Sequence, residues 1–91
     1  MNQSILFPDL QYWDDAQRQI CFMAQLQGMN IKCYISANKL AELNNFSEQP
    51  SSGEAAAMLA LFDAVRFDAE EMAEDLIAAE DFDEFGAVHL G

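Results

Sequence analysis

The amino-acid sequence predicts a small α+β domain, in which an N-terminal antiparallel sheet is packed by helices from the rest of the chain. Apolar and polar residues alternate between residues 17 and 36, which is the period of half-buried strands. Residues 54–81 are instead rich in Ala, Leu, Met and Glu, which are good helix formers. With 91 residues and 52% hydrophobic content, the chain is long enough to bury a core of its own. We expect one domain over residues 1–91, sheet-rich at 1–36, helical at 37–81 and ending in an arm or strand at 85–90.

The best-defined predicted element is a β-hairpin formed by residues 17–27 and 30–36. Its apolar positions share one face of the extended strands, namely Ile20, Phe22, Ala24, Leu26, Ile31, Cys33 and Ile35. Gly28 suits the first central position of a two-residue type II′ turn, so we expect Gly28 and Met29 to form the turn. This turn pairs Leu26 with Ile31, and a slip of one residue would split the apolar set between two faces.

Shorter elements are predicted on both sides of the hairpin. Ser4–Phe7, with Leu10–Trp13, is expected to add a strand or strand-like arm, because a two-stranded hairpin alone is only marginally stable. Ser36 is a suitable N-cap for a short helix that ends near Asn44. The polar stretch at 47–53 then predicts a loop.

Residues 54–81 are predicted to form one long amphipathic helix. Ser51 and Glu54 are spaced as a capping box before its first turn. An apolar stripe follows at spacings of three and four residues, through Met58, Phe62, Val65, Ala69, Met72 and Leu76, and it is widened by Leu61, Ala73 and Ile77. A continuous helix of this length would be about 42 Å long, which exceeds the width of a compact domain of this size. The helix is therefore expected either to extend beyond the domain or to break, and a kink near residues 67–68 is one alternative. One long or kinked helix is favoured over two separate helices.

The charge of the chain is strongly negative and unevenly distributed. Sixteen acidic residues against four basic ones give a net charge of -12, and residues 54–91 hold 11 of the acids and one of the bases. That basic residue, Arg66, is spaced to pair with Asp63 or Glu70 on a helix. The charge argues against a nucleic-acid partner and against an anionic membrane surface. Because the N-terminus also lacks the basic residues of a signal peptide, we expect a cytoplasmic protein.

Candidate metal ligands are confined to the acidic run at residues 80–84. Asp81 and Asp83 occupy positions one and three of a calcium-binding loop, but position five would be Phe85, so they are weak metal candidates. His89 is the sole histidine and has no zinc-binding spacing to the cysteines. We find no catalytic constellation and no cofactor motif, and we therefore expect neither a cofactor nor an enzymatic activity.

The two cysteines, Cys21 and Cys33, are too few for a secreted disulfide framework. In the predicted hairpin Cys33 lies on the core face and Cys21 on the opposite face, so the thiols point apart and no disulfide is expected. Both are interpreted as structural residues, with Cys21 the more accessible of the two.

A protein-interaction surface is predicted from two groups of residues. Tyr12 and Trp13 lie next to an early turn, where they either pack against the sheet or anchor an interface. Asp68, Glu71 and Asp75 lie on the polar face of the predicted long helix. The leading hypothesis is a non-enzymatic cytoplasmic domain with a protein partner at the acidic helix surface, and a homodimer through the apolar stripe is a related alternative. A small-molecule or divalent-metal binding domain is the alternative from another class, and an acidic mimic of nucleic acid is less favoured.

The same residues resemble those of a known family. The matching positions are Phe7, Pro8, Trp13, Asp14, Arg18, Ile20, Phe22, Gly28, Ile31, Cys33, Ile35, Ser36, Leu40, Phe62 and Arg66. In these positions the chain resembles the domain-of-unknown-function family numbered 1488, a family of short bacterial proteins. The resemblance implies a small α+β domain with an N-terminal antiparallel sheet and a C-terminal helix. It implies no established activity, cofactor or catalytic residue.

Overall fold

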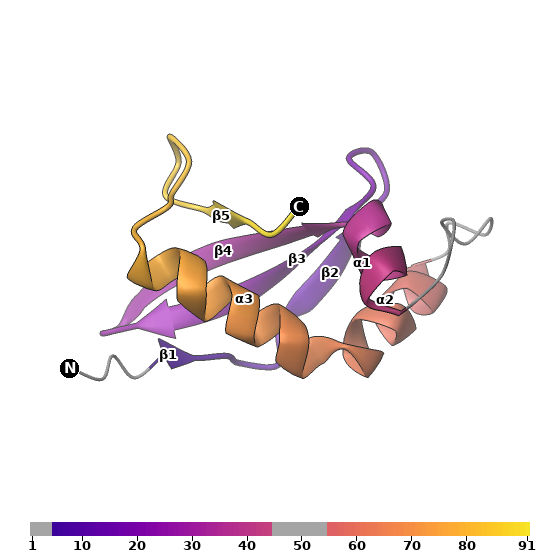
Figure 1. Ribbon diagram of the computed structural model, residues 1–91, viewed down its shortest axis with the longest axis horizontal. Helices are drawn as coiled ribbons and strands as arrows, with labels where there is room; N and C mark the ends of the chain where they lie inside the picture. The colour runs from indigo at the N-terminus through magenta and orange to yellow at the C-terminus, as the bar shows by residue number, and fades with distance from the viewer. Residues whose placement is uncertain (1–4, 45–54) are drawn as a thin grey trace.

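The computed structural model describes residues 5–44 and 55–91 (Figure 1). Within these ranges the elements are β1 (Ile5–Leu6), β2 (Gln11–Asp14), β3 (Gln19–Leu26), β4 (Met29–Ser36), α1 (Ala37–Leu43), α2 (Ala55–Ala64), α3 (Arg66–Ala78) and β5 (Val88–His89). Strands dominate the first part and helices the second, which confirms the predicted α+β class. The predicted loop at 47–53 and the Ser51–Glu54 capping box lie outside the described residues.

The strands form one mixed sheet with β3 near its centre. β3 pairs with β4 on one side and with the short strands β1 and β2 on the other, all antiparallel. β5 lies on the outer side of β4 and runs parallel to it, with Val88 beside Cys33. The predicted N-terminal antiparallel sheet is therefore confirmed, and the C-terminal strand adds a parallel pair to it.

The β3–β4 turn lies one residue earlier than predicted. Gln27 has φ 52° and Gly28 has φ 81°, which are the two positive values of a type I′ turn. The pairing is consequently Leu26 with Met29 and Ala24 with Ile31, so the predicted register is wrong by two residues. A shift of two residues leaves every side chain on its face, and the predicted apolar face is therefore the buried one.

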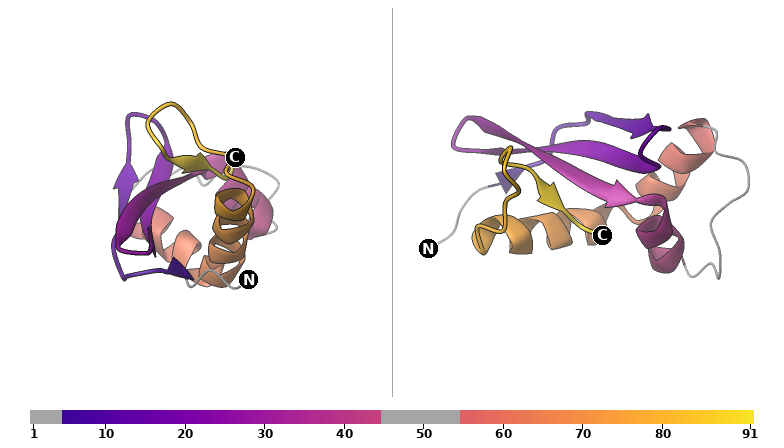
Figure 2. Two further views of the ribbon diagram at one scale, coloured as in Figure 1. Left: turned by 90° about the vertical axis from the view of Figure 1, so that its left-hand side faces the viewer. Right: turned by 90° about the horizontal axis from the view of Figure 1, so that it is seen from above.

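All three helices lie on this apolar face of the sheet (Figure 2). The core between the two layers includes the fully buried side chains of Phe22, Phe62, Ile20, Ile35, Leu40, Met58 and Val88. The rings of Phe22 and Phe62 pack at 5.0 Å between centroids. No described helix covers the opposite face, which we call the outer face of the sheet.

Helix α1 follows β4 directly and matches its prediction. The Ser36 hydroxyl accepts a hydrogen bond from the Lys39 backbone N–H at 3.1 Å, which satisfies one free donor of the first turn. At the other end the Asn44 side-chain amide donates to the carbonyls of Leu40 and Leu61. These two bonds tie the end of α1 to α2.

The predicted long helix is interrupted, and two helices replace it. The interruption is at Val65, with φ -120° and ψ 22°, two residues before the kink considered at 67–68. No proline or glycine occurs there. Val65 is itself buried, and its N–H donates to the Phe62 carbonyl at 3.0 Å. The bend lets α2 pack over β2 while α3 turns toward β5, and tertiary packing therefore outweighs local helix propensity (Figure 1).

Most of the predicted apolar stripe is buried. Met58, Phe62, Val65 and Ala69 are buried as predicted, and so are Ala73 and Ile77 from the widened part of the stripe. Met72 and Leu76 are only partly buried. Of the described helices, none is long and apolar enough to cross a membrane.

Candidate functional site

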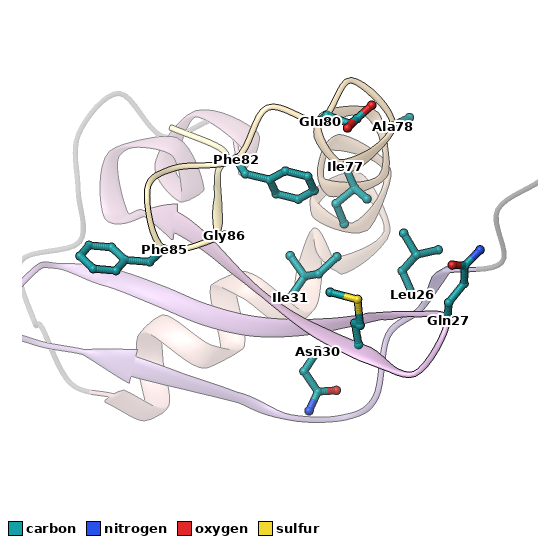
Figure 3. A pocket seen from close by; sticks show the side chains of 11 residues that line it. Leu26, Gln27, Asn30, Ile31, Ile77, Ala78, Glu80, Phe82, Phe85 and Gly86 are labelled. Carbon is teal, nitrogen blue, oxygen red and sulfur yellow. The ribbon is translucent and has the colours of Figure 1, made fainter.

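A pocket of about 590 Å³ opens between the end of the β3–β4 hairpin and the end of α3. The hairpin contributes Leu26, Met29 and Ile31, and the helix and the turn after it contribute Ile77 and Phe82. In Figure 3 the side chains of Ile77 and Phe82 face those of Ile31 and Leu26 across the opening. The volume falls within the range of about 300–1,000 Å³ that is typical of ligand sites.

The pocket exists because α3 ends before the hairpin does. Its C-terminus has the two hydrogen bonds of a Schellman motif, from the Glu80 N–H to the Ile77 carbonyl and from the Asp81 N–H to the Leu76 carbonyl. Glu80 takes the left-handed conformation that this motif requires, with φ 56°. The chain then turns back, and Phe82 follows within two residues of the turn.

Apolar side chains are unusually exposed around the opening. Met29 is 69% exposed at the tip of the hairpin, and Phe85 is 87% exposed in the turn. Phe85 points away from the cavity in Figure 3, whereas Phe82 points into it. Glu80 lines the pocket, and Asp81 and Glu84 are exposed in the same turn. The site is therefore a cavity with apolar side chains on both walls, and we call Glu80, Asp81 and Glu84 its acidic rim.

Asp83 organises the turn that carries Phe82 and Phe85. Its Oδ1 accepts hydrogen bonds from the backbone N–H groups of Phe85 at 2.8 Å and Ala87 at 2.9 Å. Its Oδ2 lies 2.7 Å from Nε2 of His89. These bonds, led by the one from Ala87, lower the pKa of the Asp83 carboxyl.

This arrangement bears on the two weak metal candidates. Both oxygens of Asp83 already have protein partners, and Asp81 is exposed. Across residues 5–44 and 55–91, no group of three or more His, Cys, Asp or Glu side chains is placed to hold a metal ion. The role that the structure gives Asp83 is to shape the turn.

We expect the turn to loosen in acid. Because the pKa of Asp83 is lowered by folding, its carboxylate stabilises the turn above the unfolded value of about 3.9, and the contribution is lost as the pH falls through the lower folded value. Amide exchange at Leu90, whose N–H donates to the Tyr34 carbonyl, reports on β5. The loss of protection of the Leu90 N–H in acid, measured against the exchange rate of an unstructured chain at the same pH, should be absent in Asp83→Asn. It should be present in Asp81→Asn. An identical pH profile in Asp83→Asn would contradict the assignment.

The predicted interaction residues do not form one surface. Asp68, Glu71 and Asp75 are exposed on α3, in the helical layer. Tyr12 is 52% exposed on the outer face of the sheet, which is turned away from the helices. Trp13 lies on the core side beside Ile20, where it is partly buried. Its indole N–H donates to Asp15 at 3.3 Å, and Arg18 lies over its ring at 5.2 Å.

The outer face carries a transverse row of side chains on four neighbouring strands. Tyr12, Cys21, Tyr34 and His89 are successive cross-strand partners, and the rings of Tyr34 and His89 stack at 5.1 Å. Interaction with the Cys21 side chain, chiefly a hydrogen bond, raises the pKa of Tyr12 to about 12. Burial is the main cause that raises the pKa of Tyr34.

The cysteines lie on opposite faces, as predicted, and both are free thiols. Cys33 is in the core, and burial raises its pKa to about 12. The prediction that Cys21 is the more accessible is wrong, since its exposure is 1%. Its register partners Tyr12 and Tyr34 flank it on both neighbouring strands.

Most residues that build the pocket are absent from the predicted site. The sequence predicts Met29 in the hairpin turn, Phe82 in the acidic run after the helix and Phe85 at the start of the C-terminal arm or strand. Two phenylalanines within a short, highly charged stretch were the available signal, because exposed apolar side chains that gather in one place mark interaction sites. The direction of each ring depended on the Schellman turn, which local sequence did not reveal.

Comparison with known proteins gives consistent results. A family model described as a protein of unknown function (DUF1488) matches residues 5–90. The uncharacterized protein YrdB of Escherichia coli K12 is 39% identical over 90 residues, covering 99% of each chain. YrdB of Shigella flexneri is 38% identical over the same length and coverage. A crystal structure of a DUF1488-family protein of unknown function from Shewanella loihica PV-4 superposes with a TM-score of 0.83 and 43% identity, covering 98% of this chain and 93% of that one.

Proposed function

We propose that this chain, which belongs to the DUF1488 family of proteins of unknown function, is a non-enzymatic protein-interaction domain. The observation that carries the proposal is the pocket, which has apolar side chains on both walls and an acidic rim. The partner would insert one large apolar side chain into the pocket and place Lys or Arg side chains against the rim. Binding rather than catalysis is proposed because the polar side chains of the lining, Gln27, Asn30 and Glu80, include no nucleophile paired with a base.

The exposure of apolar side chains supports a macromolecular partner. Met29 and Phe85 are among the residues that line the opening, yet their side chains are 69% and 87% exposed. Side chains in this position extend the apolar contact beyond what a small ligand within the pocket would cover. Large exposed apolar side chains that gather beside a cavity are typical of interaction sites.

The backbone at Glu80 supports a role for the acidic rim. A residue with a side chain costs about 1–2 kcal/mol in the left-handed conformation relative to the right-handed one, and glycine is the usual residue at this position of a Schellman motif. The chain nonetheless carries a glutamate there, with φ 56°, on the lining of the pocket. A carboxylate at this position is explained if it contacts the partner.

Selection from a displayed library of random 12-residue peptides tests the proposal. We expect enriched sequences to share a Leu, Ile, Met or Phe accompanied by Lys or Arg. Ala78 lines the pocket and is exposed, so Ala78→Phe fills the cavity from the helix end without replacing a core side chain. Binding of the selected peptides should fall at least about tenfold in this variant.

Ala79→Phe is the matched control. Ala79 is exposed, adjacent in the chain and outside the pocket lining, so this variant adds the same ring and leaves the net charge unchanged. It should bind the selected peptides like the parent protein. Peptides that bind both variants equally would be held by charge alone, and that result, or the failure to select any peptide, would refute the proposal.

A small apolar molecule in the same pocket is the second candidate, and the cavity volume of about 590 Å³ favours it. A neutral solvatochromic dye such as Nile red tests it without charge repulsion. If this candidate is correct, dye emission increases with the parent protein and with Ala79→Phe but not with Ala78→Phe, and library selection gives no pocket-dependent peptide.

A further inference from the structure

We infer that the partner segment binds as an added β-strand along the free edge of β4 at residues 29–32, next to the pocket. The inference rests on the proposed function and specifies the conformation and sequence spacing of the partner. It follows from three features of the fold, namely the backbone direction of β4, the position of the pocket and the charge of the turn above it.

The first feature is the incomplete cover of β4 by β5. β4 runs from Met29 to Ser36, but β5 pairs only with Cys33 and Tyr34. Beyond those two, the Ser36 N–H donates to the Gly91 carbonyl. Within the described ranges, no strand pairs with the outer side of β4 at residues 29–32.

The backbone groups at this edge have a defined direction. The Tyr34 carbonyl accepts from the Leu90 N–H and the Ser36 N–H donates to the Gly91 carbonyl, so even-numbered residues of β4 direct their backbone groups toward β5. Since backbone direction alternates along a strand, Asn30 and Lys32 direct theirs to the same edge. An open strand edge of this kind can accept an extended segment through main-chain hydrogen bonds.

The second feature is that the pocket adjoins this edge. Met29, Asn30 and Ile31 all line it, and Ile31 faces Phe82 and Ile77 (Figure 3). Side chains directly opposite each other on paired strands share a face of the sheet. The residue that pairs with Ile31 would therefore direct its side chain into the pocket, while its immediate neighbours in the added strand would point to the outer face.

The third feature is the acidic turn on the pocket side of the edge. Glu80 lines the pocket, and Asp81 and Glu84 are exposed nearby in the chain. On a strand, the residues that share a face with the apolar anchor lie two positions before and after it. We therefore expect Lys or Arg at these spacings, which differ from the three and four residues of a helical ligand. A second copy of this chain is disfavoured as the occupant, because each copy has a net charge of -12.

An N-methyl scan of a peptide selected on the parent protein tests the strand. Methylation removes one backbone N–H at a time, and only every second N–H of an added strand points to β4. Affinity should fall at least about tenfold at alternate positions and change less than about twofold at the intervening ones. A scan without this period of two would overturn the strand while leaving pocket binding intact. Selection of no pocket-dependent peptide would instead overturn the proposed function and this inference with it.

Matched variants of β4 give a second, independent measurement. Asn30→Pro removes the edge-directed N–H, and proline is tolerated at positions of an edge strand whose N–H does not pair within the sheet. Asn30→Ala removes the same side chain and keeps the N–H. The selected peptide should bind Asn30→Pro about tenfold more weakly than Asn30→Ala, with the amide spectrum of β3 and α3 unchanged in both variants. Equal affinity of the two variants would contradict strand addition.

Discussion

Phe62→Ala is expected to lower the free energy of unfolding by about 3–5 kcal/mol, which is a large part of the stability of a domain of this size. The Phe62 ring is 1% exposed and packs 5.0 Å from the Phe22 ring, where α2 meets the centre of the sheet. Its removal leaves a cavity bordered by rigid strands that cannot close around it. Urea denaturation followed by circular dichroism measures the loss.

Phe67→Ala is the matched control for this experiment. Phe67 lies five residues further along the chain, in the first turn of α3, and is 85% exposed. The same substitution there should change the free energy of unfolding by no more than about 0.5 kcal/mol. Comparable losses in the two variants would contradict the observed packing of α2 and α3.

Arg66→Ala should lower the free energy of unfolding by about 2–3 kcal/mol through lost charge-assisted hydrogen bonds. Arg66 is 18% exposed and donates from Nε to Glu70 at 2.8 Å, as predicted from the helical spacing. The guanidinium also donates to the Gln11 side chain at 2.8 Å and to the Pro8 carbonyl at 3.2 Å. One side chain thus links the start of α3 to the first residue of β2 and to the segment that precedes it.

Lys32→Ala separates this structural role from a general effect of charge. Lys32 is exposed on β4, and its replacement removes one positive charge from the same acidic chain. That variant should stay within about 0.5 kcal/mol of the parent in urea denaturation. Arg66→Lys should recover only part of the lost free energy of unfolding, because an ammonium group cannot form the three hydrogen bonds that the planar guanidinium donates in different directions. Full recovery with lysine would show that charge, not geometry, is responsible.

The elements that the sequence predicted well are those with strong local signals. Alternation between Ile20 and Ile35 identified the core face, and Ser36 identified the start of α1. The turn was misplaced because Gly28 suits either central position of a tight turn, and because a shift of two residues leaves the apolar pattern unchanged. The parallel direction of β5 could not be predicted from residues 88–89 alone, because it depends on their pairing with residues 33–34 of β4.

The interruption at Val65 and the pocket had no local signal strong enough to predict them. Val65 has ordinary helical neighbours, and the bend places α2 against β2 and α3 against β5. The orientation of Phe82 follows from that bend and from the left-handed Glu80. Local sequence therefore predicted which elements form, whereas the site depended on how α3 approaches the hairpin.

The parallel pairing of β5 with β4 has a consequence for how binding and folding are coupled. The walls of the pocket come from residues 26–31 and 77–86, which are far apart in the sequence, and β5 pairs with β4 just beyond them. Bringing such distant segments together costs loop-closure entropy. Any molecule that binds only when both walls are in place stabilises this arrangement by mass action. Ligand occupancy and the attachment of the C-terminal segment to the sheet are thus thermodynamically linked.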